Sequence, residues 1–587
     1  MTRHTTDFLR QRTSNLSLRN EAAMNGLSTS RLSSFANPSE FENESAISDA
    51  VKAFVVGDLA RCGFVTLCDA CLRDIPKDRR ISTNVIVESD SQKCSACSIL
   101  ASKPEAFTEP FCKFLQENPT VFHSVGYFKD KLNALGYKEL PARDDWSGKL
   151  KAGGKYFVTR NGTSIIGFTV GKAYKPGNGV AIIAGHIDAL TAKLKPVSNK
   201  PTKAGYIQLG VAPYAGGLNE TWWDRDLSIG GRVIVRDESG KTSSRLVQLD
   251  WPSKHTVFKY VTLNANWLPI VARIPTLAPH FGVGMLGQQN KETEAVPIIG
   301  LDNSDISSSN VNPVEPLGPA GSFVASQPPK LVKLISEKLG IKDHSQIVNW
   351  ELELFDLQPA TVGGLDKEFI FAGRIDDKLC SWAAFQALLA SESNDDDGVI
   401  KLVALFDDEE IGSLLRQGAR GNFLPSTIER AVESLCGENK AFGPGVLGQT
   451  YAQSFLVSAD VTHAVNPNFL SRYLDGHAPR LNVGITIAAD SNGHMTTDSV
   501  STAILTRVAE LSDCTPQVFQ IRNDSRSGGT VGPMLSSAMG VKAADAGMAQ
   551  LSMHSIRATC GSLDPGLGVK FFKGFLDKWE KVDAEWQ

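Results

Sequence analysis

The sequence predicts an α/β fold in which a β-rich insertion interrupts a domain of alternating strands and helices. Short apolar runs, typical of buried strands, occur at 180–184, 402–406 and 455–457. Residues 379–390 instead have the apolar spacing of a helix. Strands that alternate with helices in this way are typical of an open sheet covered by helices.

The pattern changes between residues 200 and 345. Polar and apolar residues alternate there, as in 232–236 and 246–250, which predicts the strands of a separate β-rich region. We therefore expect residues 106–199 and 346–587 to form one discontinuous domain, into which 200–345 is inserted.

The first 105 residues form an N-terminal extension of different composition. Residues 27–46 are rich in Ser, Asn and Glu, so we expect this part to be disordered. Two Cys-x-x-Cys pairs follow, formed by Cys68, Cys71, Cys94 and Cys97. Four such thiolates can hold one structural zinc, although the 22 residues between the pairs slightly exceed the usual spacing of about 15–20. The alternative is that these cysteines pack as small hydrophobic side chains.

Composition limits the class of protein. The chain has 587 residues, 42% of them hydrophobic, and a net charge of -4, so it lacks the basic character of a nucleic-acid-binding protein. No apolar stretch approaches the roughly 20 residues that span a membrane, and the N-terminus lacks the apolar core of a secretory signal. The ten cysteines are scattered, which fits a reducing compartment. We therefore expect a cytoplasmic protein.

Five separated patches contain residues that bind metals, and most follow an apolar run. The candidate ligands are His186, Asp376, Glu410, Asp460 and His554. Imidazoles together with carboxylates suit zinc or its first-row neighbours, whereas magnesium and calcium prefer oxygen alone. Two divalent cations about 3.5–4 Å apart repel each other and need a shared anionic bridge. The set therefore predicts a two-metal hydrolytic centre.

Each patch also has a simpler explanation. His186 and Asp188 alone could be an ordinary hydrogen-bonded pair, and Asp376 could cap the helix that follows it. The acidic run 407–410 could be a solvated turn. Because all the patches occur together beside apolar stretches, the metal centre is the better interpretation.

The chain resembles the M18 family of metallo-aminopeptidases from about Phe107 to the C-terminus. Beyond the ligand patches, the resemblance rests on family-specific strings, which include Gly210–Gly217, Trp223–Ser228, Arg273–Ala278 and Ser552–Arg557. It implies a zinc-aminopeptidase-type α/β/α catalytic domain with an inserted β-rich dimerisation domain. It also implies hydrolysis of the N-terminal residue from short peptides that carry a free amino terminus.

The resemblance assigns a role to each candidate residue. Asp376 would bridge two zinc ions, for which manganese or cobalt could substitute. His186 and Asp460 would complete one site, and Glu410 and His554 the other. Glu409 would be the general base, and Asp188 would orient His186. His280 resembles a histidine that the family presents to the active site of a neighbouring subunit, although it could equally be an ordinary loop residue.

Substrate preference is where the chain departs from the family members specific for acidic residues. Those members carry a lysine where this chain has Ala488 and an arginine where it has His494, and Asp524 belongs to a string expected to shape the same pocket. Without the lysine, a substrate carboxylate would lose a charge-assisted bond of about 1.5–3 kcal/mol. We therefore favour neutral, leucine-like N-terminal residues, with aspartyl or glutamyl residues as the alternative.

A second alternative is a non-catalytic, self-assembling cargo protein, because some family members are transported selectively as assemblies. The resemblance also implies a homododecamer built from dimers. Such assemblies reach the vacuole by a non-secretory route, so the vacuole is the alternative to the cytoplasm.

Overall fold

The computed structural model describes residues 103–249, 271–281, 290–303, 306, 315–391, 393–437 and 442–586, which belong to one compact unit, Ser102–Gln587. Residues 1–102 of the extension therefore lie outside the described residues, and so does the predicted cysteine site of Cys68, Cys71, Cys94 and Cys97. Within the described part, no helix has the length and apolar character needed to cross a bilayer.

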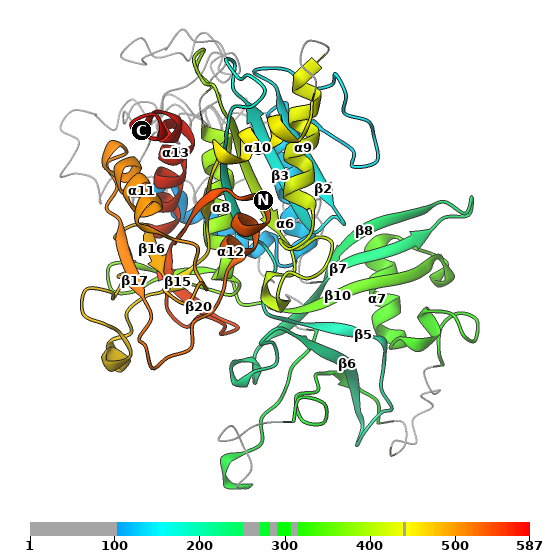
Figure 1. Ribbon diagram of the computed structural model, residues 1–587. Coiled ribbons are helices and arrows are strands. Elements are labelled where there is room, and N and C mark those ends of the chain that lie inside the picture. The colour runs from blue at the N-terminus through cyan, green and yellow to red at the C-terminus, as the bar shows by residue number, and fades with distance from the viewer. Residues whose placement is uncertain are drawn as a thin grey trace, which may run out of the picture. The chain divides into compact units, whose positions relative to one another are not determined.

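A nine-stranded mixed sheet forms the first of two large sheets (Figure 1). Its strands are β1 (Lys138–Glu139), β2 (Lys155–Arg160), β3 (Ser164–Val170), β4 (Val180–His186), β13 (Ile400–Phe406), β14 (Phe455–Ser458), β16 (Thr486–Ala489), β17 (Gln517–Gln520) and β18 (Lys542–Gly547). Their order across the sheet is β1-β2-β3-β13-β4-β14-β18-β16-β17. The three strands predicted from apolar runs, β4, β13 and β14, are confirmed, and they lie side by side and parallel. Their carboxyl ends therefore meet at one edge of the sheet.

Helices cover both faces of this sheet, which confirms the predicted α/β class. They are α5 (Thr108–Glu117), α6 (Val121–Ala134), α8 (Ile375–Ala390), α9 (Phe423–Cys436), α10 (Pro444–Ala452), α11 (Ser499–Leu511), α12 (Val531–Met539) and α13 (Asp564–Asp583). Alternate residues of β4, such as Ile182, pack with α9 and α12 in one core cluster. The other face contacts α8 and α13. Strands buried on both faces have continuous apolar sequences, which explains why they could be predicted.

A second sheet of six antiparallel strands has the order β8-β7-β10-β5-β6-β9. Its strands are β5 (Thr191–Asn199), β6 (Tyr206–Tyr214), β7 (Leu227–Arg236), β8 (Thr242–Gln248), β9 (Ile298–Leu301) and β10 (Ile347–Asp356). A core around Trp222, Val332 and Trp350 joins this sheet to α7 (Pro329–Leu339) and to the one-turn helix η6 (Glu220–Trp222). Strand β5 follows β4 of the first sheet after four residues, and both β5 and β10 belong to the second sheet although they lie outside the range 200–345.

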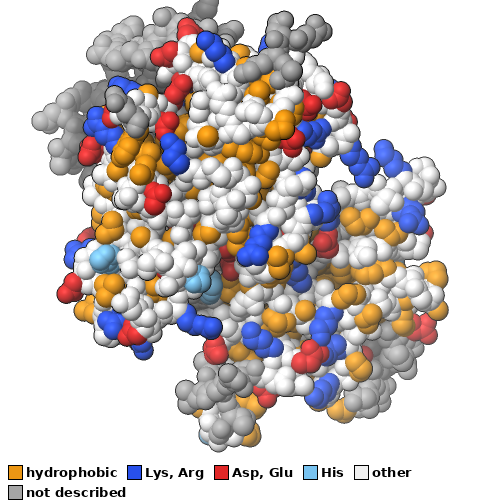
Figure 2. All heavy atoms as spheres, in the orientation of Figure 1, with side chains coloured by type: hydrophobic (Ala, Val, Ile, Leu, Met, Phe, Trp, Pro, Cys, Tyr) orange, Lys and Arg blue, Asp and Glu red, His pale blue; other side chains and the backbone are white. Residues whose placement is uncertain are grey.

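Large apolar side chains are exposed on the six-stranded sheet and its loops, and Figure 2 shows hydrophobic side chains at the surface over these strands. The exposed residues are Val197, Tyr206, Leu246, Leu277, Phe281 and Leu301. An exposed apolar surface of this kind is typical of an interaction face.

Two small sheets complete the described fold. One contains β11 (Thr361–Gly363), β12 (Phe369–Ala372) and β20 (Ala558–Gly561), and the other pairs β15 (Thr462–His463) with β19 (Ala549–Gln550). The loop between β19 and β20 carries His554.

An aromatic cluster holds the N-terminal helices against α8. The Trp382 ring lies 5.4 Å from the Phe111 ring and 6.4 Å from that of Phe114, measured between centroids. All three side chains are buried. Because α8 also carries Asp376, this cluster helps to fix the position of one candidate ligand.

We expect Phe111→Ala to lower the free energy of unfolding by about 3–5 kcal/mol, because it removes a fully buried ring and leaves a cavity. The measurement is urea unfolding at one fixed protein concentration. Lys113→Ala is the control, since Lys113 lies on the exposed side of the same helix and should change stability little. Equal stability of the two variants would contradict this account of the cluster.

Candidate metal centre

The candidate ligands converge at the carboxyl ends of the parallel strands. His186 is the last residue of β4, and Asp460 lies two residues beyond β14. Glu409 and Glu410 begin the one-turn helix η10 (Glu409–Ile411), which follows β13 after two residues. In open α/β sheets, ligands bind at this end of the strands.

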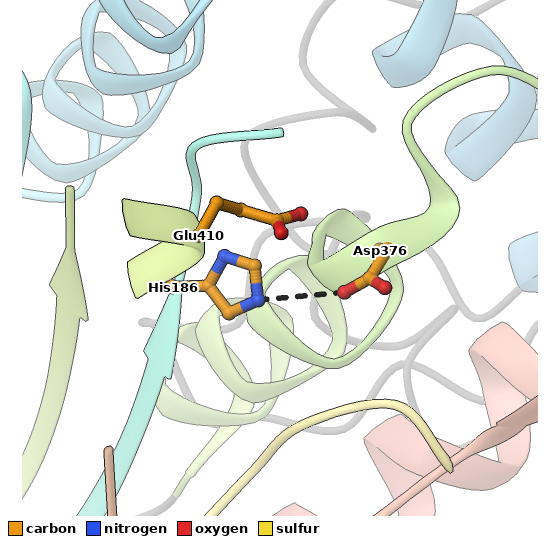
Figure 3. A group of neighbouring side chains, drawn as sticks. All are labelled: His186, Asp376 and Glu410. Atoms are coloured by element: carbon orange, nitrogen blue, oxygen red, sulfur yellow. Dashed lines mark ion pairs between the residues drawn. The ribbon is translucent and has the colours of Figure 1, made fainter. Parts of the chain in front are cut away.

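Asp376 lies in the first turn of α8, between the two imidazoles. Its Oδ1 is 3.4 Å from His186 Nε2, and its Oδ2 is 3.7 Å from His554 Nε2. Asp376 has a non-helical backbone in this turn, and its Oδ2 also accepts a hydrogen bond from Gln550 Nε2 at 3.2 Å. Figure 3 shows the Asp376 carboxylate and the His186 ring facing each other, with Glu410 alongside.

The remaining carboxylates divide between the two histidines. His186 Nε2 is 3.6 Å from Asp460 Oδ1 and 3.8 Å from Glu409 Oε2. His554 Nε2 is 3.7 Å from Glu410 Oε2. Ligand atoms of two overlapping groups lie within 4.8 Å of one another, and these groups are His186, Asp376 and Glu410, and His186, Glu409 and Asp460.

The chemistry of these donors fits divalent zinc. Carboxylate oxygens and imidazole nitrogens are its ordinary protein ligands besides thiolates. Glu410 Oε1 is buried without a hydrogen-bond partner among the described residues, and an acceptor in that position is available to a cation. The residues present therefore suit the metal.

Burial and mutual repulsion perturb the acids of the cluster. Burial raises the pKa of Glu409 to about 8, and it raises the pKa of Glu410 well above its ordinary value, helped by Asp376. Burial alone would lower the pKa of His186, but the neighbouring carboxylates, Asp460 first, outweigh it and raise the pKa. Crowded carboxylates of this kind are stable as anions only when positive charge is brought to them.

Asp188 connects the cluster to the rest of the fold. Its Oδ1 lies 3.2 Å from His186 Nδ1 and accepts a hydrogen bond from the Glu409 amide at 3.3 Å. Its Oδ2 accepts hydrogen bonds from the Glu410 amide at 3.2 Å and from the Tyr214 hydroxyl at 2.7 Å. Burial would raise the pKa of Asp188, but these partners lower it overall. The pair of His186 and Asp188 is thus part of a larger network.

Tyr214 is a site residue that the sequence did not single out, although it lies within a string used for the family resemblance. It ends β6 of the six-stranded sheet and reaches Asp188 across the junction of the two sheets. The ammonium group of Lys193 lies 3.9 Å from the centre of its ring. A polar residue from the second sheet therefore supports the centre built on the first.

Asp407 and Asp408 are two further acids whose environment the sequence did not predict. They are only 4% and 2% exposed, so the alternative of a solvated acidic turn is wrong. Burial and the nearby Asp188 raise the pKa of Asp407 to about 8 and that of Asp408 to about 6. Asp377, next to Asp376, is also fully buried, and burial raises its pKa.

The other predicted site residues lie apart from this cluster. His280 is exposed in η7 (Pro279–Phe281) and stacks on Phe281. Ala488 is buried in β16, opposite Asp545 of β18. His494 lines a cavity of about 520 Å3, to which Asp490, Gln520, Arg522 and Arg526 also contribute. Asp524 is paired with Arg522 through two hydrogen bonds of 2.8 Å.

A smaller cavity of about 30 Å3 adjoins the cluster itself. Its lining includes Asp376, Glu410 and His554 from the centre, together with Trp222 and Glu353 from the six-stranded sheet and its loops. Both sheets therefore border the space next to the candidate ligands.

Comparison with known sequences identifies related proteins. The family model described as "Aminopeptidase I zinc metalloprotease (M18)" matches residues 114–576. Vacuolar aminopeptidase 1 of Saccharomyces cerevisiae is 42% identical over 491 residues, which are 83% of this chain and 91% of that protein. An aspartyl aminopeptidase of Aspergillus oryzae is 37% identical over 497 residues, which are 80% of this chain and 96% of that protein.

Solved structures of related proteins also resemble this chain. The structure of Chaetomium thermophilum mApe1 is 66% identical, with a TM-score of 0.74, and the match covers 83% of this chain and 100% of that one. A structure described as the mApe1 dodecamer of S. cerevisiae is 38% identical, with a TM-score of 0.69, and the match covers 82% of this chain and 98% of that one.

We expect Tyr214→Phe to weaken zinc binding about 10-fold, because loss of a partner behind a ligand typically costs 10- to 100-fold in metal affinity. The measurement is competition for zinc against a chromogenic chelator. Tyr206→Phe is the control, since Tyr206 is exposed at the other end of β6. Unchanged zinc affinity in Tyr214→Phe would show that the hydroxyl does not support the centre.

Proposed function

Because the chain belongs to the M18 family of zinc aminopeptidases, we propose that it removes N-terminal residues from short peptides at a centre of two zinc ions. One observation carries the proposal. The two oxygens of Asp376 face different histidines, His186 at 3.4 Å and His554 at 3.7 Å, which is the arrangement expected of a carboxylate that bridges two cations.

The proposed ligand sets follow from the same distances. His186 and Asp460 would hold one ion with Asp376, and Glu410 and His554 would hold the other. Manganese or cobalt could take the place of zinc, because each accepts the same donors. When bound, zinc polarises the peptide carbonyl and lowers the pKa of the attacking water.

Glu409 is proposed as the general base. It precedes the ligand Glu410, and its carboxylate lies 3.8 Å from His186 Nε2, at the edge of the cluster. A carboxylate in this position can accept the proton of the attacking water and later donate it to the leaving amine. Asp188 would keep both His186 and the Glu409 amide in place through the hydrogen bonds described above.

Glu409→Gln should lower kcat by about 100- to 10,000-fold and leave the zinc content unchanged, because it removes the base and spares the proposed ligands. The measurements are steady-state peptide hydrolysis and metal analysis of the same preparation. Glu433→Gln, on the exposed side of α9, is the control. Near-normal turnover by Glu409→Gln would refute the role given to this residue.

We further propose that the enzyme prefers neutral, leucine-like N-terminal residues. Ala488 stands where acidic-residue-specific members carry a lysine, so a substrate carboxylate would lack that cation. His494 and Asp524 are proposed to shape the substrate pocket, and the imidazole of His494 could still meet an acid. Aspartyl or glutamyl specificity is therefore the competing proposal, and related proteins carry both the vacuolar and the aspartyl names.

The test uses paired leucyl and aspartyl chromogenic substrates, before and after chelation and with zinc, manganese or cobalt restored. We expect metal-dependent cleavage with kcat/KM at least about 10-fold higher for the leucyl substrate, given the missing charge-assisted bond. Preference for the aspartyl substrate, abolished in His494→Ala, would support the competing specificity. Absence of cleavage with every metal would favour the non-catalytic cargo protein.

Assembly is proposed to use the inserted region 200–345, whereas 106–199 and 346–587 would form the catalytic domain. The exposed apolar side chains described on the six-stranded sheet support this division, since obligate interfaces between copies are rich in such residues. We propose a homododecamer, in which the exposed His280 would reach the centre of a neighbouring subunit.

The cytoplasm is the proposed location, with the vacuole as the alternative.

A further inference from the structure

The side chain of His554 receives little support from packing. The His554 side chain is 56% exposed, whereas that of His186 is 2% exposed. Both Ser552 and His554 have a φ of +62°, in the left-handed region that non-glycine residues seldom occupy. A ligand in such a loop needs other contacts to hold it in place.

Two hydrogen bonds from the turn at η6 provide these contacts. The Asn219 amide Nδ2 donates to the His554 carbonyl at 2.9 Å. The Ile556 amide donates to Thr221 Oγ1, also at 2.9 Å. The turn is 335 residues away in the sequence, and its two side chains bind the loop at His554 and two residues beyond it.

Hydrogen bonds between its own residues hold the turn in shape. Asn219 Oδ1 accepts hydrogen bonds from the Thr221 amide at 3.0 Å and from the Thr221 hydroxyl at 2.6 Å, so each residue orients the other. Trp222, the next residue, is buried in the core of the six-stranded sheet. The six-stranded sheet therefore fixes the position of the turn, and the turn in its place holds the loop that carries His554.

We propose that Asn219 and Thr221 are positioning residues that hold His554 for the metal. This inference rests on the proposed function, in which His554 is a ligand of one ion. Because the contacts reach only the His554 loop, their loss should affect the ion held by Glu410 and His554 and spare the one held by His186 and Asp460. The turn at η6 would thus control one of the two ions.

Thr221→Val removes the hydroxyl and keeps the shape of the side chain. Asn219→Asp keeps the oxygen that orients Thr221 but replaces the donor with an oxygen facing the His554 carbonyl. We expect each variant to bind one of its two zinc ions about 10- to 100-fold more weakly and the other unchanged. The measurement is zinc content per subunit after dialysis against graded concentrations of chelator.

Two controls separate positioning from general destabilisation. Thr221→Ser keeps the hydroxyl and should bind both ions as the original protein does. Asp343→Asn changes a similar turn at η9 (His344–Gln346), where Asp343 accepts hydrogen bonds from the Ser345 amide at 2.9 Å and from the Ser345 hydroxyl at 2.8 Å. This second control should also leave both affinities unchanged.

His554→Ala, measured in parallel, distinguishes the two possible failures. If it binds two zinc ions with unchanged affinity, His554 is not a ligand and the proposed centre is wrong. If it loses one ion while Thr221→Val and Asn219→Asp keep both, the centre stands and the positioning role is overturned. Hydrogen exchange of the amides of residues 552–556, faster in both variants than in Thr221→Ser, would provide support independent of activity.

Discussion

The hydrogen bonds to the buried carboxylate of Asp188 are the interaction on which the centre depends. A buried anion is costly unless donors replace its water, and here the two oxygens have partners from three separate parts of the chain. They are the His186 ring at the end of β4, the Glu409 and Glu410 amides after β13, and the Tyr214 hydroxyl at the end of β6. Since the anion needs all of these donors, it fixes them relative to one another. The hydrogen bonds to Asp188 therefore hold the ends of adjacent strands together as one site.

The fold and the convergence of the candidate ligands were largely predictable because each depends on local sequence. A strand buried on both faces must be apolar along its length, so β4, β13 and β14 could be recognised, and the polar residues after them then pointed to one edge. The α/β class follows from the same runs. The limits proposed for the insertion rest on composition alone, which does not show that β5 and β10 pair with the strands between them.

Contacts between distant segments could not be predicted. Tyr214, Asn219 and Thr221 act through single hydrogen bonds to residues that only the folded chain brings near, and an isolated Asn or Thr in a loop gives no sign of such a partner. The burial of Asp407 and Asp408 was hidden for a related reason. Their local sequence is that of an exposed acidic turn, whereas in the fold the Tyr214 hydroxyl lies 3.5 Å from Asp408 Oδ1 and the Asp407 amide donates to Ser164 Oγ of β3 at 3.0 Å.

Asp356 shows why burial of an acid does not by itself indicate a metal site. This carboxylate ends β10 and is fully buried, yet it accepts hydrogen bonds from Arg225 at 2.9 Å and Arg557 at 3.0 Å, so two guanidinium groups neutralise it within the protein. Arg557 lies three residues after His554, and the same contact anchors that end of the loop. The contacts of Asp376 are instead the His186 and His554 imidazoles and the Gln550 amide, and Glu410 Oε1 has no hydrogen-bond partner among the described residues. The fold thus neutralises Asp356 internally, whereas the candidate ligands would be neutralised by bound cations, as the proposed metal centre requires.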